Sequence, residues 1–193
     1  PACLIAVGAL FLTLQKHESA PQKPLSFELI RTFFRINPLR CLYFTQLFHQ
    51  AVLWSTVFLL PDVLHARGYS STIAFGGGHF ALLLGAGLGC LPAGLLGDRF
   101  TPAKTIFGGF FLGICLLYTF LLCPHLSETT LLVLLFSFGA SIGPMTPLAL
   151  ALGTSLMPTA RGVVSAFLMG LVWIVSEGFG IGLSGLLADL FPT

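Results

Sequence analysis

The stretch CLYFTQLFHQAVLWSTVFLLP, from Cys41 to Pro61, runs for 21 residues without a charged side chain. An α-helix rises about 1.5 Å per residue, so a helix of this length reaches across the ~30 Å hydrocarbon core of a bilayer. The stretch therefore predicts a membrane-spanning helix.

Four further stretches of the same kind follow it toward the C-terminus. Short loops that carry the few charged residues separate them, and one acidic residue, Glu177, interrupts the last. The sequence thus predicts an all-α, polytopic helical membrane protein. The predicted spans cover about 41–61, 75–97, 105–123, 131–152 and 162–188.

The overall composition agrees with a membrane protein. Of the 193 residues, 55% are apolar and only 8% are charged, against about a quarter charged in an ordinary soluble domain. So few charged residues exclude a soluble enzyme and a disordered tail. The net charge of +2 is too small to attract nucleic acid, so a nucleic-acid-binding protein is excluded as well. The five cysteines are not spaced like metal ligands, so no metal is predicted. No cofactor is predicted either, because the one dinucleotide-like glycine pattern, at 180–185, lies inside a predicted span.

The basic residues orient the spans. If the spans alternate, eight of the nine Lys and Arg residues lie on one side of the membrane and only Arg67 on the other. The positive-inside rule then places the eight in the cytoplasm. They are Lys16, Lys23, Arg31, Arg35, Arg40, Arg99, Lys104 and Arg161.

The sequence predicts that the chain is divided into three parts. Residues 1–14 are apolar and are expected to be the end of a preceding transmembrane helix, so the chain is expected to be a fragment of a longer protein. Residues 15–40 are polar and basic and are expected to form a cytoplasmic linker, either amphipathic on the membrane surface or a plain solvated loop. The transmembrane bundle is expected to occupy 41–193.

The loop after the second span carries a recognisable motif. The sequence GLLGDRFTPAK, from Gly94 to Lys104, resembles the cytoplasmic loop signature of the major facilitator superfamily. Gly94, Gly97, Asp98, Arg99 and Lys104 fit that signature. Thr101 stands where a glycine is usual, and Pro102 and Ala103 stand where basic residues are usual.

The resemblance implies a fold and a position in it. Superfamily members have twelve helices in two six-helix halves joined by a cytoplasmic linker, and the loop locks one of the alternating conformations. The chain would then be the second half without its last helix, and its partner would be the missing N-terminal half. The stretches 147–173 and GLLADLF (185–191) are similar to the fosmidomycin-resistance group, which implies a drug exporter in a bacterial inner membrane.

Glu177 is the acidic residue inside a predicted span. Burying a carboxylate in a membrane favours its neutral form, so Glu177 is a candidate to carry a proton. Trp173 lies one turn earlier on the same face and is a candidate to stack on a flat or cationic substrate. The structural alternative is a hydrogen-bonded Glu that holds two helices together.

A second polar group lies on the first span. Gln46, His49 and Gln50 fall within about one turn, and Trp54 follows a turn later on the same face. These side chains are candidates to line a substrate cavity. A cluster that packs helices through hydrogen bonds is the alternative.

The fourth predicted span contains Pro144 and Pro147. Each proline removes a backbone hydrogen bond, so a break in the helix is expected. The break would either expose carbonyl groups to a cavity and act as a hinge, or be a static kink.

Together these residues predict a secondary transporter that exports drugs in exchange for protons by alternating access. Uptake or exchange of an anionic metabolite is one alternative, although no span interior carries a basic residue to bind an anion. A membrane-embedded serine hydrolase is another, because residues 139–143 (GASIG) fit a nucleophile-elbow pattern around Ser141. For the transporter, the expected partners are lipid, a small-molecule substrate and protons.

Overall fold

The computed structural model describes residues 27–190, and it is helical throughout apart from short turns. Five helical segments are long and apolar enough to cross a membrane, as the sequence predicts. The all-α class is therefore confirmed. The predicted helix end at 1–14 and the linker up to residue 26 lie outside the described residues.

The five segments are longer than the predicted apolar stretches. The first is α3 (Asn37–Ala66), and the third is α5 (Pro102–Leu122). The second joins a π-helical turn, η1 (Ile73–Gly77), to α4 (Gly78–Phe100). The fourth is divided into α6 (Glu128–Ile142) and α7 (Met145–Leu156). The fifth comprises η2 (Pro158–Ala160), α8 (Arg161–Ser165), the π-helical η3 (Ala166–Leu171) and α9 (Val172–Leu190).

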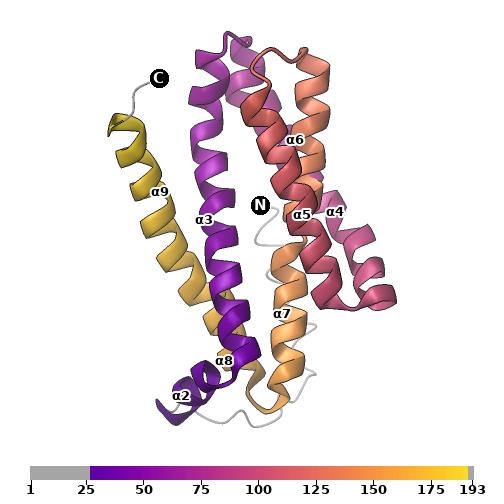
Figure 1. Cartoon of the computed structure of the whole chain (residues 1–193), viewed down its shortest axis with the longest axis vertical. Helices are drawn as coiled ribbons and strands as arrows, with labels where there is room; N and C mark the ends of the chain where they lie inside the picture. The colour runs from indigo at the N-terminus through magenta and orange to yellow at the C-terminus, as the bar shows by residue number, and fades with distance from the viewer. Residues whose placement is uncertain (1–26, 191–193) are drawn as a thin grey trace, which may run out of the picture.

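The described part of the predicted linker is helical. A short helix, α2 (Phe27–Arg35), lies across the end of the bundle beside the start of α3, as Figure 1 shows. Its Phe33 is fully buried, and the ring stacks on Phe167 at 4.8 Å between centroids. Both α2 and the first turn of α3 lie within the predicted linker. The Phe33 contact shows that α2 packs on the bundle and is not a solvated loop.

Two pairs of helices hold the bundle together. α4 packs on α6 and α3 packs on α9, while α5 lies against α6 and α7. Glycine makes the α4–α6 contact close: a Cβ at Gly85 would collide with the backbone of Phe136, and one at Gly139 with the backbone of Leu82. Small residues that let backbones approach in this way are typical of helix pairs in membranes.

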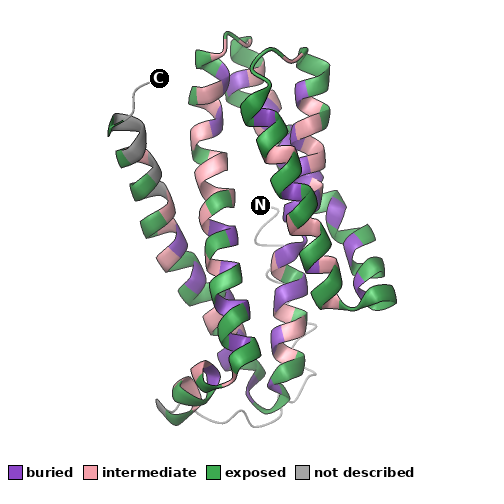
Figure 2. Ribbon diagram, viewed as in Figure 1, coloured by how far each residue is buried: buried purple, intermediate pink, exposed green. Residues whose placement is uncertain are grey.

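The outer faces of the helices are apolar. Figure 2 shows exposed positions along the outside of the bundle, and many belong to large hydrophobic side chains. Leu91 and Leu95 on α4 and Phe107 on α5 are each more than 70% exposed. A surface of this kind is unfavourable in water and suits contact with lipid.

The turn between α4 and α5 contains a strained residue. Thr101 has φ 108° and ψ 142°, a region that is essentially restricted to glycine. Its amide donates to the Gly97 carbonyl at 3.1 Å, and its carbonyl accepts from the Thr105 amide at 3.2 Å, so the hydrogen bonds of the turn hold this conformation. The position is the one at which the loop signature usually has glycine.

We therefore expect Thr101→Gly to stabilise the protein by about 1–3 kcal/mol, because glycine adopts this conformation without strain. Thermal unfolding of the purified protein in detergent measures the change. Thr101→Ala is the control, since alanine keeps the Cβ and with it most of the strain. An unchanged or lower unfolding temperature for the glycine variant would contradict the prediction.

Candidate functional site

The polar side chains of α3 are buried together. Gln46, His49 and Gln50 are each less than 8% exposed. The two glutamine Nε2 atoms donate to the same acceptor, Thr146 Oγ1, at 2.7 Å from Gln46 and 3.0 Å from Gln50. This face of α3 is therefore directed at the start of α7.

The partner of the α3 cluster is the break in the fourth span. Helix α6 ends at Ile142 and α7 begins at Met145, so the break lies at 143–144. Of the two prolines expected to break the span, Pro144 lies at the break and Pro147 lies in the first turn of α7. His49 Nε2 lies 3.1 Å from the Ile142 carbonyl oxygen. A carbonyl oxygen only accepts, so Nε2 carries the hydrogen. The cluster thus binds a helix break that exposes backbone to side chains.

Several polar atoms of this region have no partner. Within the part of the chain that the structure describes, they are Gln46 Oε1, His49 Nδ1, Gln50 Oε1 and Trp54 Nε1. The two amide oxygens are acceptors, as is Nδ1 in a neutral ring, and the indole N–H is a donor. Leaving such atoms unpaired costs about 1–3 kcal/mol each. A bound molecule or water that donates hydrogen bonds would satisfy the three acceptors, and one that accepts would satisfy the indole N–H.

Trp54 connects the cluster to α9. Its ring lies 5.9 Å from that of Trp173, edge to face. One turn beyond Trp173, Glu177 is half-buried, and no hydrogen bond or ion pair joins it to another described residue. The helix-joining hydrogen bond that was the structural alternative for Glu177 is thus not seen in residues 27–190.

The predicted gating loop lies against the same helix break. Gly94, Gly97 and Asp98 line a cleft of about 290 Å³ together with Pro144 and Pro147. A Cβ on Gly97 would lie 3.0 Å from Leu148 Cδ2, so α4 and α7 are in close contact there. The structure thus brings together the loop and the broken helix, which the sequence presents as separate features.

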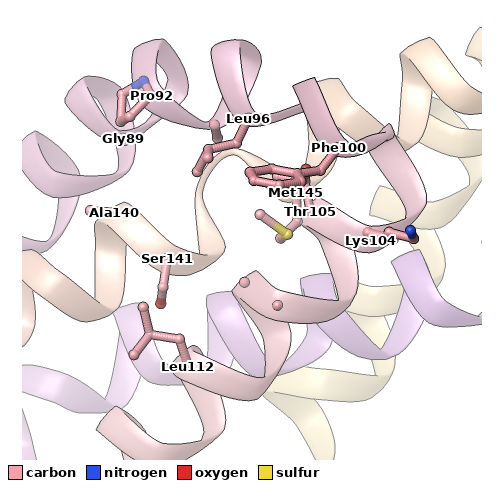
Figure 3. A pocket seen from close by; sticks show the side chains of 13 residues that line it. Gly89, Pro92, Leu96, Phe100, Lys104, Thr105, Leu112, Ala140, Ser141 and Met145 are labelled. Atoms are coloured by element: carbon pink, nitrogen blue, oxygen red, sulfur yellow. The ribbon is translucent and has the colours of Figure 1, made fainter. Parts of the chain in front are cut away.

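The charged residues of the loop do not pair with one another. Arg99 lies over the Phe100 ring, 5.5 Å from its centroid, and Lys104 lines a different cleft, between α4 and α5 (Figure 3). Among the described residues, Asp98 makes no hydrogen bond or ion pair. Neither Arg99 nor Lys104 forms an ion pair with an acidic side chain in residues 27–190.

Ser141 does not have the surroundings of a nucleophile. Its hydroxyl donates to the Phe138 carbonyl of its own helix at 2.8 Å. No imidazole or carboxylate among the described residues is hydrogen-bonded to it. Nor do residues 27–190 contain a group of three or more His, Cys, Asp or Glu side chains that could hold a metal ion.

The family model of the Major Facilitator Superfamily matches residues 1–191. The chain belongs to the major facilitator superfamily. No curated protein and no solved structure matches it. Superfamily members are secondary transporters of small molecules, so this chain is a multi-pass membrane protein of a transporter family and contacts the lipid bilayer.

The sequence alone did not indicate two groups of the site. They are the Thr146 hydroxyl and the Ile142 carbonyl, which the α3 side chains bind. Thr146 lies between the two prolines. A polar residue beside a predicted helix break was the sequence signal that could have identified it. The carbonyl carries no signal of its own, because any residue supplies one.

Proposed function

We propose that the chain transports a small molecule by alternating access and that the substrate binds where α3 meets the helix break. The observation that carries the proposal is the set of buried, unpaired atoms on Gln46, His49 and Gln50, beside the break at 143–144. Trp54 and Trp173 extend this surface toward α9 with aromatic rings.

The position of the break supports a role in the conformational change. The cleft shared by Asp98, Pro144 and Pro147 places the helix break beside the loop after α4. A change in the angle at the break moves the first turn of α7 against this loop. Pro144 and Pro147 would then set the hinge of the conformational change. The cytoplasmic gate would be formed by the loop residues Gly94, Gly97, Asp98, Arg99 and Lys104.

The charges favour a cationic or hydrogen-bond-donating substrate. Every Lys and Arg in residues 27–190 lies in α2 or within about a turn of a span's end, whereas Glu177 lies inside the last span. The anionic-metabolite alternative has no such support. We propose proton-coupled drug efflux, with Glu177 as the proton carrier, as in a fosmidomycin-resistance-like exporter of a bacterial inner membrane.

The proposal also assigns the chain a place in the transporter. If residues 1–14 end helix six and 15–40 are the linker, the second described span would be helix eight, and the loop motif would be the second-half copy of the signature. The chain would then act together with a first half, and α2 and the residues before it would lie on the cytoplasmic side.

Gln50→Leu tests the proposed site. Leucine removes an unpaired buried acceptor as well as a donor, so we expect the unfolding temperature to stay the same or rise slightly. The initial rate of ethidium transport, driven by a pH gradient in proteoliposomes that contain the transporter with its first half, is expected to fall about tenfold.

Thr56→Val is the matched control on the same helix. The Thr56 hydroxyl donates to the Val52 carbonyl within α3 and takes no part in the cluster. Its ethidium transport is expected to equal that of the wild type. If Gln50→Leu transports ethidium at the wild-type rate, the cluster is not the substrate site; if it unfolds instead, the cluster is structural.

A further inference from the structure

A second cleft, of about 330 Å³, lies between α4 and α5. Figure 3 shows it extending along α4 from Gly89 and Pro92 past Leu96 to Phe100, with Lys104 beyond Phe100 at one end. Its walls are apolar except for Lys104, Thr105 and Ser141. The cleft is separate from the α3 cluster, because none of Gln46, His49 and Gln50 lines it.

Small residues give the cleft its depth. Gly89 and Gly109 bring α4 and α5 so close to the α6–α7 region that a Cβ on either would collide with Ala140 or Met145. Gly108 differs from them, since nothing lies within 4 Å of a Cβ built on it. The space beside Gly108 is therefore open, and its apolar walls suit a hydrocarbon chain.

Positive charge gathers at one end of the cleft. Lys104 is part of its lining, and Arg99 is held over the ring of Phe100, which also lines it. Arg99 lies in the last turn of α4 and Lys104 in the first turn of α5, at the ends of two candidate membrane spans, so they lie where spans meet the membrane surface. Basic residues at that level attract the anionic head groups of lipids.

We propose that this cleft binds one anionic phospholipid. An acyl chain lies along α4 between Leu96 and Gly108, and the phosphate group lies at Lys104 with Arg99 beside it. The charge complementarity selects an anionic head group, and the apolar walls select a lipid over a free anion. The lipid would lie on the outside of the bundle, and its binding does not depend on the proposed substrate site at α3.

Native mass spectrometry of the purified full chain tests the proposal, with dioleoyl phosphatidylglycerol or dioleoyl phosphatidylcholine added to the detergent. The wild type is expected to retain the anionic lipid in preference to the zwitterionic one. Lys104→Gln is expected to weaken phosphatidylglycerol binding about fivefold, the effect of one basic residue at the membrane surface. Because Lys104 is exposed, this change leaves the fold intact.

Gly108→Phe tests the apolar part of the site. The added ring fills the open space and is expected to reduce phosphatidylglycerol binding at least as much as Lys104→Gln. Gly87→Phe is the matched control, because Gly87 is also exposed with nothing within 4 Å of its Cβ and does not line the cleft. Arg161→Gln is the matched control for the loss of one positive charge, because Arg161 is predicted on the same side of the membrane and does not line the cleft. It is expected to bind phosphatidylglycerol as the wild type does.

Three results would overturn the proposal. The first is equal retention of the two lipids by the wild type, and the second is undiminished phosphatidylglycerol binding by Lys104→Gln or Gly108→Phe. The third is displacement of the lipid by millimolar inorganic phosphate, which would make the cleft a site for a free anion.

Discussion

Gly85→Val is expected to abolish the folded bundle. A Cβ at Gly85 would overlap the backbone oxygen of Phe136, and a backbone atom cannot turn away as a side chain can. Helices α4 and α6 would have to separate along the most extensive contact in the structure. We expect a loss of about 3 kcal/mol or more, measured as the absence of monodisperse protein on size-exclusion chromatography in detergent.

Gly87→Val is the control for this change. Gly87 lies two residues further along α4, is exposed, and has open space around its Cβ position. The same side chain on the same helix is therefore expected to leave the protein monodisperse. Equal yields of the two variants would show that the α4–α6 contact does not hold the bundle together.

Glu177→Gln is expected to abolish proton-coupled transport and to leave expression unchanged. Glutamine keeps the size and polarity of the side chain but cannot take up or release a proton. Since Glu177 makes no hydrogen bond or ion pair with another described residue, little stability is lost with its charge. Ethidium movement in proteoliposomes with an imposed pH gradient is expected to fall to the level of empty liposomes.

Glu128→Gln serves as the matched control for that substitution. Glu128 is an exposed carboxylate in the first turn of α6, where it accepts a hydrogen bond from Ser70 at 3.0 Å. Transport by this variant is expected to remain close to that of the wild type. Undiminished pH-driven transport by Glu177→Gln would remove Glu177 from the coupling mechanism.

Hydropathy and charge were enough to predict the five spans, because every helix that crosses a bilayer needs an apolar stretch of a minimum length. The ends of the helices were less predictable. α3 begins at Asn37 and continues to Ala66, beyond the uncharged stretch from Cys41 to Pro61. Arg40 lies within its first turn, where a long side chain can reach the membrane surface.

The pairing of the helices could not be predicted. Gly85 and Gly139 are two of 22 glycines, and their sequence surroundings do not distinguish them from Gly87, where a Cβ would have no atom within 4 Å. Only the three-dimensional packing shows which glycine faces a neighbouring backbone. For the same reason the sequence did not indicate that Asp98 and the proline break line one cleft.

The candidate site was predicted in part. Helical periodicity placed Gln46, His49 and Gln50 on one face, and the structure directs that face at α7. Their shared acceptor, Thr146, could not be predicted, because the sequence does not say how the fourth span lies relative to the first. The proposed roles of these residues, and of Glu177, Trp54 and Trp173, remain predictions.

The glycine contacts between α4 and α6 also restrict how the protein can move. At each of these glycines the backbone of one helix occupies the space that a Cβ would fill on the other. If the two helices slid past each other, this backbone would collide with the side chains of neighbouring residues. We therefore expect α4 and α6 to move as a single rigid body. Gly143 belongs to the same contact, because a Cβ on it would collide with Ala86 of α4. Bending would then be confined to the residues after Gly143, and a small rotation there would be amplified along the length of α7.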